Sequence, residues 1–247
     1  MPKPKKRILN LFLILIIGGL GGILADQFIL PYLVTIPPFS KIEFIRQASN
    51  GTTIINPTEE IIIIENTALE QAIDKISPCL VAIQSYQNKK LLSQGTGFVV
   101  TGDGLIITAG GLIPPKADQY LVFRNNQSLT AQLVKKDFET NLALLRIEET
   151  NLPVVSLDSL ENLHLGQRII LIGLQPQEDI FSRFVNLGII RSINQEILKI
   201  NLAEENTLAN GSPLINIKGE VIGLNLVDYK GLLETIPANK IKEFIGL

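Results

Sequence analysis

Histidine, cysteine and tryptophan are almost absent from this chain of 247 residues. It contains one histidine, one cysteine and no tryptophan, and aromatic residues make up only 6% of it. A metal site built from histidine and cysteine ligands is therefore excluded, and Cys79 has no second cysteine with which to form an internal disulfide. Because 46% of the residues are hydrophobic and few are aromatic, the core must be aliphatic.

Motifs for common cofactors are missing as well. Neither an EF-hand nor a Walker pattern occurs, and Gly95-Thr-Gly97 lacks the third glycine and the following helix of a dinucleotide-binding loop. A Mg²⁺ or Ca²⁺ site made only of carboxylates stays open, although adjacent pairs such as Glu148-Glu149 point apart in a strand. We expect no cofactor and no metal.

Positive charge is concentrated at the N-terminus. The first seven residues include Lys3, Lys5, Lys6 and Arg7, and removing these four charges from the net charge of −2 leaves −6 for the remainder. An acidic body whose basic residues gather at one end argues against a nucleic-acid partner.

A long apolar run follows the basic residues. Between Ile8 and Ala25 only Asn10 is polar, and the length is about the minimum for a membrane-spanning helix. The sequence predicts a basic cytoplasmic tail over 1–7 and a transmembrane signal anchor over 8–25. The protein would then cross the cell membrane once, with its body outside the cytoplasm. A cleaved secretory signal is the alternative, but cleavage after Ala25 would place Ile23 where a small residue is required.

The next segment is predicted to be a juxtamembrane linker over 26–66. Proline and glycine interrupt it, and the apolar run Ile61–Ile64 within it is compatible with a strand. Thr67-Ala-Leu-Glu70 has the pattern of a capping box and predicts a short helix that ends at Ile76.

Short strands separated by turn residues fill the rest of the chain, and a last helix over 238–245 begins after Pro237. No alternation of strands and helices is present, which argues against a parallel α/β fold. Twelve strands in two sets of six indicate an all-β sandwich or a pair of barrels. They are Leu80–Ser85, Gly95–Val100, Leu105–Ala109, Tyr120–Arg124, Leu129–Lys136, Leu142–Ile147, Arg168–Gly173, Phe184–Ser192, Ile197–Asn201, Pro213–Ile217, Val221–Val227 and Leu232–Ile236.

Seven short motifs in this order resemble the trypsin-like serine protease domain of the HtrA (Deg) family. They are Ser77-Pro-Cys-Leu-Val-Ala-Ile83, Gly95-Thr-Gly-Phe98, Asp103-Gly-Leu-Ile-Ile-Thr108, Asn141-Leu-Ala-Leu-Leu145, Leu165-Gly-Gln167, Gly219-Glu-Val-Ile-Gly-Leu-Asn225 and Ile236-Pro-Ala-Asn239. The resemblance implies the chymotrypsin fold, with two six-stranded antiparallel β-barrels and an active site between them. The protease-fold domain would span 67–247, with barrel 1 at about 78–150 and barrel 2 at about 160–237.

The catalytic positions depart from the family pattern. The family's serine lies in a Gly-Asn-Ser-Gly-Gly-Pro-Leu turn, and the corresponding stretch here is Leu208-Ala-Asn-Gly-Ser-Pro-Leu214. Asn210 therefore replaces the serine, Gly111 replaces the histidine and Asn141 replaces the aspartate. Leu208 takes the place of the glycine whose N–H serves the oxyanion hole, and a branched residue resists the positive φ that this role needs. We expect no catalytic residue here, and we expect residues 208–211 to line a peptide-binding cleft, with their turn holding the second barrel together.

One substitute mechanism remains open. Ser212, two residues after the lost serine, could act as the nucleophile with His164 as its base. In the family the loop that contains His164 lies away from the cleft, and Ser212 fits better as a residue of the following strand.

The sequence therefore predicts a membrane-anchored pseudoprotease outside the cytoplasm, lacking the PDZ module usual in the family. Its expected ligand is an extended peptide or unfolded protein. Its alternative partner is an active HtrA-type protease in a homo- or hetero-oligomer, because the family commonly forms trimers. Two other functions stay open: an active serine endopeptidase of envelope protein quality control, and a purely structural envelope protein.

Overall fold

The computed structural model describes residues 4–29, 32–33, 36, 57–125, 127–177, 180–203 and 207–246. Most of the predicted linker before residue 57, the start of the basic tail and residues 204–206 lie outside the described residues. The chain divides into two compact units, residues 1–63 and 64–247. Each unit is therefore described by itself.

The N-terminal unit contains the predicted apolar helix. Helix α1 runs from Pro4 to Leu24 and continues as a π-helical turn, η1 (Ala25–Ile29). The 18-residue stretch Phe12–Ile29 has a mean hydropathy of 2.0, and none of its described side chains is buried. Among the described residues this is the one helix that is long and apolar enough to cross a membrane.

Helix α4 corrects one sequence prediction and decides a second point that the sequence left open. It spans Pro57–Ile76, so it begins ten residues before the predicted start at Thr67, and the run Ile61–Ile64 is helical instead of extended. Proline in the first turn lacks only an N–H that has no helical partner there, and the acidic residues Glu59 and Glu60 favour the positive end of a helix. These two signals prevail over the strand preference of the four isoleucines.

The first barrel closes in the order β1-β2-β3-β6-β5-β4, because β1 also pairs with β4. All six strands were predicted, with ends that differ by a few residues. They are β1 (Leu80–Gln87), β2 (Lys90–Val99), β3 (Leu105–Ala109), β4 (Gln119–Arg124), β5 (Gln127–Asp137) and β6 (Leu142–Arg146).

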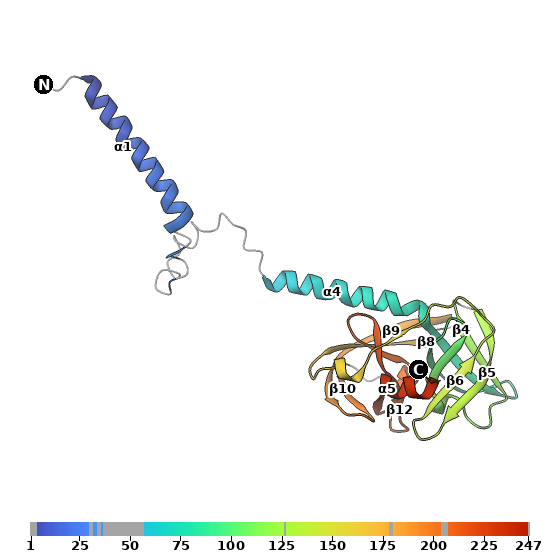
Figure 1. The fold of residues 1–247 in the computed structure, drawn as a ribbon. Helices are drawn as coiled ribbons and strands as arrows, with labels where there is room; N and C mark the ends of the chain where they lie inside the picture. Colours follow the sequence, from blue (N-terminus) through green and yellow to red (C-terminus); the bar gives the residue numbers. More distant parts are fainter. Residues whose placement is uncertain are drawn as a thin grey trace. The chain divides into compact units, whose positions relative to one another are not determined.

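The second barrel lies beside the first (Figure 1) and closes through the pairing of β11 with β12. Its six strands were also predicted. They are β8 (Arg168–Gln177), β9 (Ile180–Ile193), β10 (Leu198–Leu202), β11 (Pro213–Ile215), β12 (Glu220–Val227) and β13 (Leu233–Pro237). The sequence prediction missed a seventh strand, β7 (Ser156–Leu157), which pairs in parallel with the start of β12.

Aliphatic side chains fill three buried clusters, as the composition requires. One cluster fills the first barrel around Val81, Ile106 and Leu145, and another fills the second barrel around Leu171 and Ile222. The third lies between the barrels and includes buried residues of α4 and of the last helix, α5 (Ala238–Ile245). The two barrels are therefore joined by a shared core, which holds any site between them in a fixed geometry.

Candidate functional site

The three positions predicted to replace the catalytic triad meet in space. Gly111 lies in the 3₁₀ turn η3 (Gly110–Leu112), Asn141 directly precedes β6, and Asn210 directly follows the 3₁₀ turn η5 (Thr207–Ala209). A Cβ atom added at Gly111 would lie 3.9 Å from Nδ2 of Asn210 and 4.0 Å from Oδ1 of Asn141. A side chain at position 111 would therefore be close enough to contact both of the other two.

Strand pairing brings Asn141 next to the 3₁₀ turn η3. Strands β3 and β6 are antiparallel, with Ala109 opposite Leu142, and the Gly110 N–H donates to the Asn141 carbonyl at 2.6 Å. Asn141 has a φ of 54°, in the left-handed region that asparagine and aspartate adopt more readily than most residues. The backbone at this position would accept an aspartate as easily as the asparagine present.

Backbone hydrogen bonds hold the turn at Asn210 against both barrels. The Thr96 N–H of β2 donates to the Asn210 carbonyl at 3.0 Å, and the Gly211 N–H donates to the Asn225 carbonyl of β12 at 2.7 Å. Gly211 has a φ of 79°, and a Cβ atom there would lie 2.1 Å from the Thr96 carbonyl oxygen. The turn therefore joins the second barrel to the first, which goes beyond the predicted role within the second barrel alone.

The side chain of Asn210 is also engaged. Its Oδ1 accepts a hydrogen bond from the Val227 N–H at 3.2 Å, near the end of β12. A carboxamide has no nucleophilic oxygen or nitrogen, and Gly111 offers no base. At these three positions the side chains can form hydrogen bonds but cannot carry out acyl transfer.

The oxyanion position has the conformation expected from its sequence. Leu208 lies within η5 and is absent from the residues whose φ is positive. Of the predicted cleft residues 208–211, Ala209 and Gly211 are buried, while Leu208 and Asn210 are partly exposed. A ligand would reach side chains of this turn only at Leu208 and Asn210.

Ser212 is in no position to replace the missing serine. Its side chain is fully buried at 0% exposure, and its Oγ accepts a hydrogen bond from Nδ2 of Asn225 at 3.1 Å. Asn225 is fixed in turn by Thr235, whose hydroxyl donates to Oδ1 of Asn225 at 2.7 Å. His164 is exposed in the loop before β8, where its backbone N–H donates to Oε1 of Gln167.

Sequence reasoning missed the polar network formed by Ser212, Asn225 and Thr235. The available signal was Asn225 itself, a polar residue within the apolar run Val221–Val227 of a predicted barrel strand. A buried asparagine requires hydrogen-bond partners inside the protein, so its presence in this strand marks a buried polar contact.

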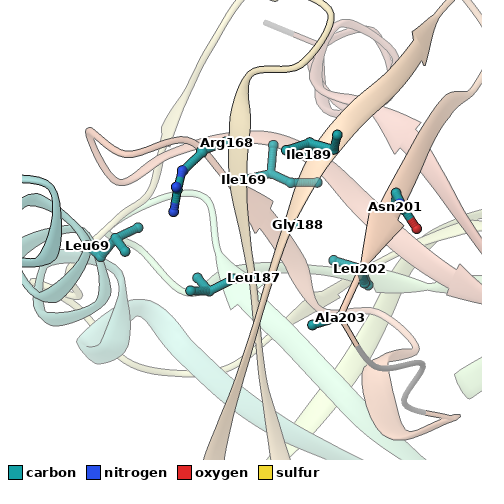
Figure 2. Close-up of a pocket in the computed structure, with 9 residues that line it drawn as sticks. All are labelled: Leu69, Arg168, Ile169, Leu187, Gly188, Ile189, Asn201, Leu202 and Ala203. Atoms are coloured by element: carbon teal, nitrogen blue, oxygen red, sulfur yellow. The ribbon is translucent and has the colours of Figure 1, made fainter. Parts of the chain in front are cut away.

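Two of the hollows in the protease-fold domain differ in whether they include a predicted site residue. One has a volume of about 380 Å³ and is lined by Asn141 together with Ile197, Leu226, Ile236 and residues around them, so it borders the candidate site. The other has a volume of about 350 Å³ and contains none of the predicted site residues. Figure 2 shows this second hollow, in which Leu69 of α4 stands opposite strands of the second barrel.

The remaining side chains of the described residues offer neither a metal site nor a reactive thiol. Among the residues that the structure describes, no three His, Cys, Asp or Glu side chains gather closely enough to hold a metal ion. Cys79 is buried, and this burial raises the pKa of its thiol, with Arg124 opposing the change to a smaller extent. A thiol with a raised pKa is a poor nucleophile.

Comparison with known proteins agrees with this fold. The model of the trypsin-like peptidase domain family matches residues 95–224, which is more than half of the chain. A crystal structure of the serine endoprotease from Yersinia pestis superposes with a TM-score of 0.63 at 26% sequence identity. The superposition covers 72% of this chain and 65% of that one.

Curated relatives are serine proteases by name. The chain is 27% identical over 222 residues to serine protease HTRA1A of Danio rerio, covering 82% of this chain and 46% of the relative. It is 35% identical over 159 residues to a probable periplasmic serine endoprotease, DegP-like, of Halomonas elongata, covering 59% of this chain and 33% of the relative. The chain thus spans less than half the length of either relative.

Proposed function

This chain belongs to the trypsin-like peptidase family and is of the HtrA type, and from that premise we propose that it binds extended peptides or unfolded protein without cleaving them. The observation that carries the proposal is the composition of the candidate site. Gly111, Asn141 and Asn210 lie close together, and none of them supplies a nucleophile or a base.

Peptide binding needs only the parts of the site that are present. An extended peptide can add to the exposed edge of a strand through backbone hydrogen bonds, while its side chains enter adjacent hollows. The hollow beside Asn141 has Leu226 and Ile236 in its wall together with Glu196, Glu234 and Lys240, so it offers both apolar and charged contacts to one such side chain. Joining an active relative in a mixed oligomer would use the same fold, and purification of the native membrane complex would identify such a relative.

The first test is for hydrolysis. We expect the full chain to leave unfolded casein intact and to resist labelling by a fluorophosphonate probe, which reacts with activated serines. Ser212→Ala should behave as the wild type does in both assays, because Ser212 is buried and hydrogen-bonded. Labelling that disappears in Ser212→Ala would instead establish an active endopeptidase that uses this serine.

The same preparation tests binding. We expect fluorescein-labelled casein to show a saturable rise in fluorescence anisotropy as the full chain is added in detergent. Casein that remains intact and unbound at all protein concentrations would exclude this ligand class, and a structural role in the envelope would then be the better account.

We further propose that the helix over Phe12–Ile29 stays attached as a membrane anchor, with the domain outside the cytoplasm. The basic residues before it support this orientation, and the poor cleavage site after Ala25 supports retention. Mass spectrometry of the protein from native membranes should then detect peptides that precede Ala25. A uniform new N-terminus at Asp26 would show that the segment is a cleaved signal.

A further inference from the structure

The edge of β12 that faces the Asn210 turn carries a hydrogen-bond donor without a strand partner. Strand β12 pairs with β11 only as far as Leu224, opposite Pro213. Beyond it, the N–H of Asn225 donates to the Ser212 carbonyl at 2.9 Å, so the turn continues the pairing for one more residue. Alternate residues of a strand direct their N–H groups to the same edge, so Val227 presents its N–H where this pairing has ended.

A side chain takes the place of the missing strand. The Val227 N–H donates to Oδ1 of Asn210 at 3.2 Å, the long end of the usual range for such a bond. The carboxamide oxygen of asparagine has the same acceptor chemistry as a peptide carbonyl. A peptide that extended the sheet along this edge would place one of its own carbonyls against the same N–H.

The side chain of Asn210 can leave this position while its backbone remains in place. The Asn210 carbonyl is held by the Thr96 N–H, and the next residue, Gly211, is held by the Asn225 carbonyl. Both bonds involve the backbone, so rotation of the Asn210 side chain breaks neither. A peptide carbonyl can therefore replace Oδ1 of Asn210 as the acceptor if a single side chain moves. That side chain is partly exposed.

We propose that Asn210 is an internal cap on this edge of β12, and that an entering peptide must displace its carboxamide from the Val227 N–H. The inference rests on the proposed function, because it assumes that peptides bind along this edge. It assigns a role to the residue that stands at the position of the family's nucleophile: Asn210 sets how readily a peptide enters.

The test compares Asn210→Ala, which removes the acceptor, with Asn210→Asp, which keeps an oxygen in place, and with Asn201→Ala as a control. Asn201 is an exposed asparagine on β10, where it lies opposite Ile189 of β9. Hydrogen exchange at the Val227 amide of the full chain in detergent reports the cap directly. Anisotropy of fluorescein-labelled casein reports binding.

In Asn210→Ala we expect exchange at Val227 to accelerate by about fivefold and the affinity for casein to rise by about fivefold, the usual worth of one hydrogen bond. Asn210→Asp and Asn201→Ala should stay close to the wild type in exchange. Unchanged hydrogen exchange at the Val227 amide in Asn210→Ala would overturn the inference. If the wild type binds casein, faster exchange in this variant without a gain in its affinity for casein would overturn it too. If no variant binds casein, the proposed function fails and this inference fails with it.

Discussion

The triple variant Gly111→His, Asn141→Asp, Asn210→Ser is expected to remain a poor peptidase until Leu208→Gly is added. The geometry accepts the first two changes, and the third replaces a side chain by a smaller one. A Cβ atom at position 111 meets nothing closer than 3.9 Å, and the left-handed backbone at Asn141 suits aspartate. A triad without an oxyanion hole still leaves the tetrahedral intermediate without stabilisation.

We expect Leu208 to be the residue that withholds this stabilisation. It lies in a 3₁₀ turn without a positive φ, whereas the resemblance implies a glycine that turns its N–H toward the reacting carbonyl. Replacement by glycine removes the steric barrier to that conformation. We expect Leu208→Gly in the triple background to raise the rate of casein cleavage by about 10²-fold or more, the usual contribution of one oxyanion donor.

Leu208→Ala in the same background is the matched control. Alanine removes the bulk of the side chain but keeps the Cβ atom that disfavours positive φ, so it should not rescue activity. Circular dichroism should be the same for all variants, because the substituted residues lie outside the buried aliphatic clusters. Efficient cleavage by the triple variant, with no gain from Leu208→Gly, would show that the oxyanion position was functional all along.

Strand periodicity and turn residues were enough to predict both barrels. Strand β3 agrees residue for residue, since Gly104 with its φ of 97° precedes it and the glycines of η3 follow it. Strand β7 could not be predicted in this way. It has two residues, and only its pairing with β12, far along the sequence, makes it a strand.

The run Ile61–Ile64 shows a different limit. Four β-branched residues in a row have neither the alternation of a strand nor the spacing of an amphipathic helix, so their conformation depends on what flanks them. Helix signals lay on both sides, at Pro57 and at Leu69, Ala72 and Ile76. Considered together, the signals on the two sides would have predicted one continuous helix.

At the candidate site, the resemblance supplied the three positions, and the structure supplied their contacts. That Gly111, Asn141 and Asn210 lie together follows from the strand pairing of the fold. The bond from Val227 to the Asn210 side chain depends on how far β12 continues past its pairing with β11. Sequence periodicity fixes which face of a strand a residue occupies, but it does not fix where the pairing between two strands ends.

A second large effect, on stability, is expected at Gly211, which lies where the two barrels meet. A Cβ atom there would lie 2.1 Å from the Thr96 carbonyl oxygen and 2.5 Å from the Thr108 hydroxyl oxygen, both in the first barrel. Since the nearest of these atoms belongs to the backbone, the turn itself must move away from β2. That movement would break the bond between the Thr96 N–H and the Asn210 carbonyl.

We therefore expect Gly211→Ala to lower the free energy of unfolding by about 3–5 kcal/mol, which is the upper part of the sum of a left-handed backbone, about 1–2 kcal/mol, and an overpacked contact, about 1–3 kcal/mol. Gly166→Ala is the matched control. Gly166 has nearly the same φ, 78°, but a Cβ atom there would meet nothing within 4 Å. Gly166→Ala should lower the free energy of unfolding only through the left-handed backbone, by about 1–2 kcal/mol.

Thermal unfolding of the full chain in detergent, followed by circular dichroism, separates the two contributions. The midpoint should fall by about 10 °C or more in Gly211→Ala and by roughly 3–6 °C in Gly166→Ala. The difference between the variants measures the contact of the turn with the first barrel, since the strained backbone is common to both. Equal midpoints would mean that the turn is not held against β2, and the fixed backbone on which the cap by Asn210 depends would then be lost as well.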